Sequence, residues 1–166
     1  MPTYEREVPM DPDTKKVIDI INDVKVAMVT TSAGGRLVSR PLTVMEVQDD
    51  GDLWIFTSAD AHVLSEIAAE PQVNASFAGS RRWVSLNGTA SVVDDPAKKH
   101  ELWNPLVEAF IPEGPDSSNA VLVRVASEHA EYWDNPTGFA GVLARWVKAK
   151  ATGEPAHPGG SGGTDL

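Results

Sequence analysis

Hydrophobic and polar residues alternate along several short stretches of the chain, which is the spacing of strands that bury one face. Residues 24–47 contain two such stretches around Gly34 and Gly35, and this arrangement predicts a β-hairpin. Pro41 in the second stretch has no N–H to donate, so it predicts an edge or a bulge at that point. Further strands are expected at 53–58, 72–78, 82–93 and 120–134, the last of them bent near Ser127.

Apolar residues spaced three and four apart predict helices between these strands. Helices are expected from Asp13 or Thr14 to Asn22, from Asp60 to just before Pro71, from Asp94 or Asp95 to Phe110, and over 138–153. Short turns join most of the strands, and the helices are inserted between them. This order predicts a mainly β domain, an antiparallel barrel that is closed or nearly closed, with peripheral helices.

The two ends of the chain lack this periodicity. Residues 1–12 are charged and rich in proline, which predicts a loosely docked N-terminal arm. Residues 152–166 are rich in glycine and proline, which predicts a disordered tail. The predicted barrel domain therefore spans residues 13–151, and the length of 166 residues suits a single domain.

The composition narrows the classes of partner. The net charge is −10, and an acidic surface repels nucleic acid and anionic lipid, so neither is expected as a partner. The absence of cysteine excludes disulfides, thiolate catalysis and cysteine-type zinc sites. The first residues do not form a signal peptide and no apolar run has the length of a membrane span, so we expect a cytoplasmic protein.

Common catalytic signatures are absent from the sequence. The four histidines have no metal-ligand spacing, so no metal site is expected. There is no G-x-G-x-x-G motif after a strand, no P-loop and no G-x-S-x-G elbow. No general acid or base stands out, and the catalytic residues remain unassigned.

One constellation suggests a binding site for an anion. Ser39 and Arg40 lie on an otherwise apolar strand, and Thr57 and Ser58 end the next strand just before a helix begins. Hydroxyls, a helix N-terminus and a guanidinium together can hold a phosphate. The alternative is a capped helix beside a partly exposed arginine.

Four long stretches of the chain match a family in residue type and order. They are "GRLVSRPL", "LWIFTSADAHVLSEIAAEPQV", "WVSLNGTASVVDDPAKKHELWNPLVEAFIPEG" and "VLVRVASEHAEYWD". In these stretches the sequence resembles the general stress protein branch of the pyridoxamine 5′-phosphate oxidase-like superfamily. The resemblance implies the fold of that superfamily, the FMN-binding split antiparallel β-barrel.

The resemblance also implies a homodimer that holds an FMN-type cofactor between its two subunits. Residue by residue it assigns to the cofactor Ser39, Arg40, Pro41, Leu42, Phe56, Thr57, Ser58, Ala61, His62 and Val63. Relatives often carry Ser at position 61 and Lys at position 63, so Ala61 and Val63 each remove a phosphate donor. FAD and the deazaflavin F420 are therefore kept as alternatives to FMN.

Three functions follow as hypotheses. The first is a flavin-dependent oxidoreductase that acts on a small-molecule substrate or electron donor, with a link to stress physiology. The second is a flavin carrier or sensor without turnover, and the third is a dimeric barrel that has lost the cofactor. Vitamin B6 synthesis is not expected, because "ARWVKAKATGEPAHPGG" replaces the Arg- and Leu-rich segment through which pyridoxamine oxidases grip their substrate.

Aromatic residues are concentrated between residues 101 and 136. They are Trp103, Phe110, Tyr132 and Trp133. We expect these rings to pack a helix on the barrel and to complete the surface of the dimer, with some of them near the flavin cleft, because aromatic side chains bury a large area with few rotatable bonds.

Overall fold

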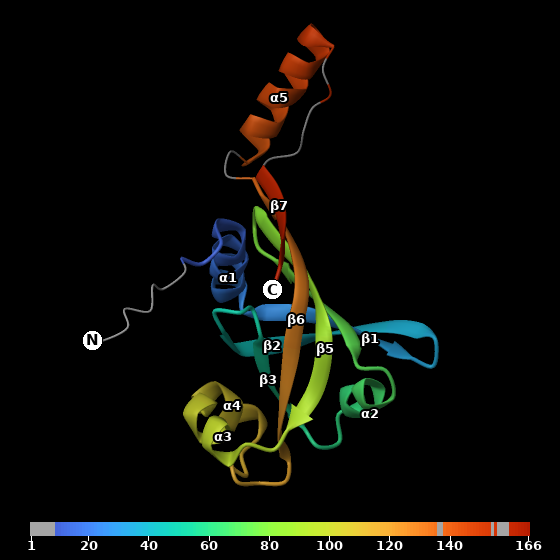
Figure 1. The fold of residues 1–166 in the computed structure, drawn as a ribbon, viewed down its shortest axis with the longest axis vertical. Helices are drawn as coiled ribbons and strands as arrows, with labels where there is room; N and C mark the ends of the chain where they lie inside the picture. The colour runs from blue at the N-terminus through green and yellow to red at the C-terminus, as the bar shows by residue number, and fades with distance from the viewer. Residues whose placement is uncertain (1–8, 136–137, 154, 156–159) are drawn as a thin grey trace, which may run out of the picture.

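The computed structural model describes residues 9–135, 138–153, 155 and 160–166, and in them a mainly antiparallel β-structure with helices around it (Figure 1). The strands are β1 (Val26–Ala33), β2 (Arg36–Val47), β3 (Leu53–Ser58), β4 (Gln72–Ala78), β5 (Arg82–Val93), β6 (Ala120–Asp134) and β7 (Gly160–Asp165). The helices are α1 (Pro12–Val24), α2 (His62–Ala69), α3 (Pro96–Leu102), α4 (Pro105–Phe110) and α5 (Gly138–Thr152). The predicted mainly β architecture is confirmed.

The strands form a ring that is split on one side. Their order is β3-β2-β1-β4-β5-β6-β7, and β3 also pairs with β6, which closes the ring. β2 pairs with β3 from Val44 to Val47, with a bulge at Met45. In the described part of the chain, residues 36–43 of β2 pair with β1 and leave their other edge open, and Pro41 lies in this part.

Two helices close the interior of the barrel. α1 contributes Val17, Ile20 and Ile21 to the main core, and α2 contributes Val63 and Ile67. The α1 helix begins with Pro12 because the Asp11 carboxylate accepts hydrogen bonds from the backbone N–H groups of Asp13 and Thr14. This start lies before the predicted one.

A pair of short helices covers the outside of β3 and β6, at the bottom of Figure 1. The sequence predicted one helix from Asp95 to Phe110, but the structure divides it into α3 and α4. Pro105 disfavours a helical conformation at Asn104 and cannot donate a backbone hydrogen bond, so α3 ends and α4 begins there. Asn104 then caps α4 by accepting from the N–H groups of Leu106 and Val107.

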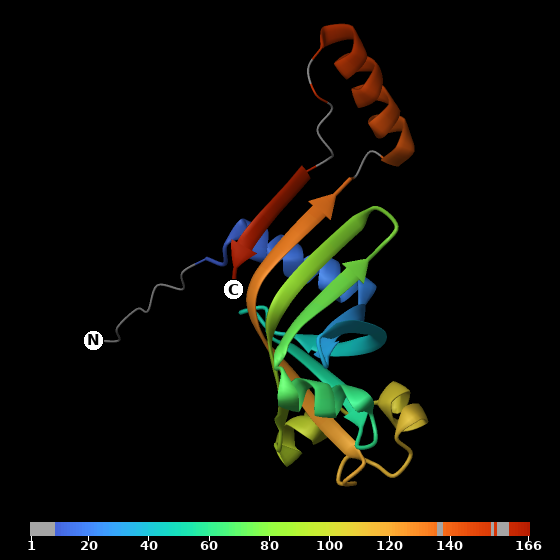
Figure 2. The same ribbon diagram turned by 90° about the vertical axis from the view of Figure 1, so that its right-hand side faces the viewer.

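The β5–β6 pair carries a bulge where the sequence predicted a bend. Asn87 pairs with His129 and Gly88 with Ser127, so Glu128 is the extra residue. At Gly88 a Cβ atom would lie 2.3 Å from the carbonyl oxygen of Ala126, and the position therefore requires glycine. The bulge bends β6 along its length (Figure 2).

The C-terminal segment differs from its prediction. It was expected to be disordered, but residues Gly160–Asp165 form β7, which pairs with β6 from His129 to Asp134. The ladder uses backbone groups of an open strand edge, so it needs no apolar side-chain pattern. A side chain at Gly162 would begin 2.8 Å from the Tyr132 ring, so the glycine content here allows close packing.

Two absences concern the described residues. None of their helices has the length and apolar character needed to cross a membrane. No group of three or more His, Asp or Glu side chains among them is arranged to hold a metal ion.

Candidate functional site

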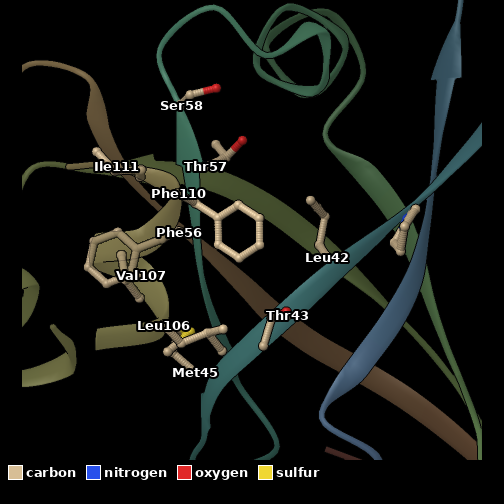
Figure 3. Close-up of a pocket in the computed structure, with 11 residues that line it drawn as sticks. Leu42, Thr43, Met45, Phe56, Thr57, Ser58, Leu106, Val107, Phe110 and Ile111 are labelled. Carbon is tan, nitrogen blue, oxygen red and sulfur yellow. The ribbon is translucent and has the colours of Figure 1, made fainter. Parts of the chain in front are cut away.

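A cavity of about 310 Å³ opens where β2 and β3 separate (Figure 3). Eleven residues line it: Pro41, Leu42, Thr43, Met45, Phe56, Thr57, Ser58, Leu106, Val107, Phe110 and Ile111. Two walls come from the separated strands and the third from α4 and the residue after it. The split of the barrel therefore creates the cavity.

The α4 wall is apolar and partly exposed. Val107 and Ile111 are buried against Ala120 of β6, which fixes the helix in place. Phe110 is 78% exposed and Leu106 is 51% exposed, although both line the cavity. In Figure 3 the Phe110 ring points from α4 toward Leu42 of β2. An aromatic ring in this position offers a flat apolar surface to a ligand.

The polar side of the cavity is the end of β3. Thr57 and Ser58 present hydroxyl groups there, and the Ser58 hydroxyl donates to Asp60 at 2.6 Å. Asp60 was predicted to cap α2, but the residue at the cap is Ala61, which offers no side-chain acceptor. The first turn of α2 therefore has no side-chain cap. Its first backbone N–H groups are not bonded to a capping side chain, and such groups can bind an anion.

Arg40 takes part in a polar cluster between β2, β1 and α2. Its guanidinium donates to the Thr31 hydroxyl at 2.6 Å and forms an ion pair with Glu66 of α2. The Thr31 hydroxyl in turn donates to the same Glu66 carboxylate. The side chains of Arg40 and Glu66 are 21% and 12% exposed, so the cluster is mostly shielded from water.

The cluster changes the acidity of Glu66. The hydrogen bond from Thr31 lowers the pKa of the Glu66 carboxyl below its ordinary value of 4.5, and Arg40 lowers the pKa further. Partial burial acts in the opposite direction but is outweighed. Glu66 is therefore charged at neutral pH and forms its ion pair with the guanidinium of Arg40.

The structure brings together five of the ten residues that the sequence assigned to a cofactor. Pro41, Leu42, Phe56, Thr57 and Ser58 all line the cavity. The other five lie elsewhere: Ser39 bonds to Thr30, Arg40 to Glu66, Ala61 is the cap residue of α2, His62 is exposed, and Val63 is buried in the core. Val63, where the resemblance led us to expect a lysine, is a core side chain.

Sequence reasoning missed the α4 wall and the partner of Arg40. Leu106, Val107 and Phe110 were predicted on one helix, and Ile111 was predicted to begin the loop after it. Some of the aromatic rings were expected near the flavin cleft, but the spacing of the aliphatic residues did not indicate a cavity wall. Glu66 was given no role from the sequence, although it lies in a matching stretch. An acidic residue one turn after the predicted phosphate-binding turn was the available signal.

The cavity fits one part of a flavin better than the other. Its volume lies at the lower end of the range for small-molecule pockets, about 300–1,000 Å³, and its apolar walls suit a planar ring system. The end of the cavity that would hold the phosphate has fewer hydrogen-bond donors, because Ala61 and Val63 offer no donor side chain and Arg40 is bonded to Glu66.

The concentrated aromatic residues have separate structural roles. Trp103 packs edge-on against Phe56 behind the cavity, with ring centroids 5.4 Å apart. Tyr132 donates its hydroxyl proton to Asp13 of α1 and packs on the main core. Trp133 pairs across the strands with Trp83 on the outer face of the sheet, where the two are 38% and 40% exposed.

The ring of antiparallel strands, its split edge and the cavity in that split define a split-barrel protein. The sequence model of the family described as pyridoxamine 5′-phosphate oxidase like matches residues 12–157. The chain belongs to this family.

Individual relatives agree with this assignment. Protein bli-3 of Neurospora crassa is 27% identical over 165 residues, which cover 92% of this chain and 79% of that protein. The structure of a general stress FMN/FAD binding protein from Xanthomonas citri is 25% identical and has a TM-score of 0.66, covering 75% of this chain and 93% of that one. A candidate general stress protein 26 from Jannaschia sp. CCS1 has a TM-score of 0.71 at 22% identity, covering 92% and 98%. The predicted general stress branch and the split-barrel fold are confirmed.

Proposed function

We propose that this protein binds a flavin of the FMN type in the cavity between β2, β3 and α4. One observation carries the proposal. The sequence assigned residues on two separate strands to the cofactor, and in the fold residues from both strands line the same cavity. The similar protein from Xanthomonas citri, described as FMN/FAD binding, supports the same ligand class.

The residues have distinct roles in this proposal. Phe110, Leu42 and Phe56 contact the ring system, while Thr57 and Ser58 with the start of α2 face the phosphate. Arg40 contacts the phosphate after its guanidinium releases the Glu66 carboxylate. FAD would extend beyond a cavity of about 310 Å³, and a deazaflavin would share the apolar ring contacts.

We also propose that the protein is a homodimer with the cavity at the subunit interface. Val26 and Met28 of β1 lie on the same outer sheet face as Trp83 and Trp133, and all four are at least 38% exposed. Exposed apolar patches rimmed by polar residues mark sites of association. A second copy on this face would also protect the open edge of β2.

The chemistry of the lining bears on catalysis. Among the described residues the lining supplies hydroxyls from Thr43, Thr57 and Ser58 but no carboxylate, imidazole or amine. A bound flavin would supply hydride or electron transfer, and the chain would bind and orient it. An oxidoreductase of this kind relies on the cofactor for its reactivity, and the same lining suits the second candidate, a flavin carrier or sensor without turnover.

The cavity assignment is tested by Phe110→Ala, compared with Leu37→Ala. Both side chains are highly exposed, 78% and 80%, but Leu37 lies outside the cavity. Loss of an aromatic contact is worth about 1 kcal/mol, so Phe110→Ala should weaken FMN binding about fivefold in a fluorescence-quenching titration. Leu37→Ala should bind as the parent does. Equal affinity of all three proteins would refute the assignment of α4 to the site.

A further inference from the structure

Helix α5 presents an apolar stripe that is exposed in the described part of the chain. The helix extends beyond the end of the sheet, on the far side from α3 and α4 (Figures 1 and 2). Leu143, Trp146 and Val147 follow one another at helical spacing and are 49%, 56% and 56% exposed. At its base Arg145 donates to Asn135, which ties the helix to the end of β6.

The charge of α5 is opposite to that of the chain as a whole. Its segment from 138 to 152 contains Arg145, Lys148 and Lys150 and no acidic residue, although the net charge of the chain is −10. Lys150 lies over the Trp146 ring, 4.9 Å from its centroid. The stripe is therefore apolar at its centre and cationic at its edge.

A complementary surface lies at the opposite end of the molecule. We call residues 101–116, which include α4, the α4 corner. This segment contains Glu101, Glu108, Glu113 and Asp116 and no basic residue. It also exposes Leu106 and Phe110 at the rim of the cavity. Glu101 and Asp116 are paired with Lys98 and His100 of α3, so Glu108 and Glu113 supply the acidic charge beside the apolar rim that matches the apolar, cationic stripe of α5.

The positions of the two surfaces decide how they can meet. They occupy opposite ends of the long axis, so α5 cannot reach the α4 corner of its own chain (Figure 1). A contact between unlike surfaces of two copies builds an open chain unless a symmetry axis closes it. A two-fold axis perpendicular to the long axis exchanges the ends, and both contacts then form within one dimer.

We propose that α5 of one copy packs on the α4 corner of a second copy, so that Trp146 covers the Leu106–Phe110 rim and closes the mouth of the cavity. The inference rests on the homodimer proposed above and adds to it that each site is completed by a helix of the other subunit. An anionic bilayer is not favoured as the partner of α5. The helix has three basic residues, but the chain as a whole has a net charge of −10, which an anionic bilayer repels.

Disulfide trapping tests the contact directly, since the chain has no cysteine of its own. Val147→Cys lies on the α5 stripe, and Ala109→Cys is an exposed position of α4 outside the cavity lining. Chains carrying one or the other substitution, with different tags, are mixed, exchanged and oxidised mildly. A matched control replaces Ala109→Cys with Ala68→Cys, an exposed alanine of α2.

The expected result is a disulfide that joins the two tagged chains in the 147–109 mixture, at a yield at least about tenfold that of the 147–68 control. A dimer by light scattering with equal yields in both mixtures would overturn the placement of α5 but leave the dimer intact. A monomer would overturn the dimer and this inference together, whether or not FMN binds. Co-sedimentation with phosphatidylglycerol vesicles that is lost in Trp146→Ala would overturn the inference in favour of a membrane surface.

Discussion

The guanidinium of Arg40 is bonded to Glu66 and Thr31, so a phosphate group in the cavity must compete with a carboxylate for it. Glu66 is held in turn by Thr31, and its pKa is lowered. The sequence assigned Arg40 to the phosphate without this competitor. In the proposed site, Glu66 would therefore lower the affinity for the phosphate, as would the missing donors at Ala61 and Val63.

Substitution of Glu66 by glutamine should release Arg40 for a phosphate. A charge-assisted hydrogen bond contributes about 1.5–3 kcal/mol, so Glu66→Gln should tighten FMN binding about tenfold. Riboflavin, which has no phosphate, should bind with unchanged affinity. Glu70→Gln, at the exposed end of the same helix, serves as the control. If the FMN-to-riboflavin affinity ratio is the same in both variants, Arg40 does not contact the phosphate.

The same carboxylate makes the stability of the fold depend on pH. Its folded-state pKa lies below the ordinary value of 4.5, so it stabilises the protein above that pH and this contribution is lost as the pH falls through the folded pKa. At pH 7 the Glu66→Gln variant should have a lower free energy of unfolding than the parent. On acidification to about pH 3.5 this free energy should decrease less in the variant than in the parent. Urea unfolding at both pH values measures the difference. Parallel losses in the two proteins would contradict the pKa assignment.

At the level of elements, β7 shows how a glycine-rich segment can be ordered. Its backbone pairs with β6, the Leu166 N–H donates to the Glu128 carbonyl at 3.0 Å, and the Leu166 side chain packs against the main core. The Thr164 hydroxyl bonds to that of Thr14 at 2.9 Å, which joins β7 to α1. These contacts make the segment part of the barrel wall.

Deletion of residues 160–166 should therefore destabilise the protein. A strand edge and a packed leucine contribute about 2–4 kcal/mol together, after allowance for the entropy of ordering. The melting temperature, followed by circular dichroism, should fall by several degrees. Leu166→Ala should account for part of the decrease, and the exposed Leu37→Ala for none. A truncated chain that melts with the parent would show that β7 is not a stable element.

The elements differ in how far the sequence alone predicts them. Alternation and turns located β1 to β6, because each buries one face along a continuous stretch. β7 was missed because backbone pairing leaves no side-chain pattern, and the break before α4 was missed although Pro105 indicated it. In the site, the two strand segments were found through their motifs, whereas the α4 wall and Glu66 depend on packing between distant segments.

At the scale of the whole molecule, the split of the barrel connects the fold with the proposed binding site. Residues 36–43 of β2, which precede the bulge at Met45, are separated from β3, and the cavity occupies the space between the two strands with α4 as its third wall. The outer sheet face and the two opposite ends of the molecule present apolar surface that a second copy can cover. A dimer built in this way would place two cavities at its interface, each next to residues of both subunits.

Equilibrium titration of FMN with the full chain, followed by quenching of flavin fluorescence, tests the central claim most directly. The account predicts saturable quenching with one FMN per chain and a Kd in the micromolar range, because the ring contacts are present but the phosphate contacts are incomplete. Riboflavin should bind with similar affinity. Absence of saturable quenching by either flavin at millimolar protein would contradict flavin binding. The hypothesis of a dimeric barrel that has lost the cofactor would then remain.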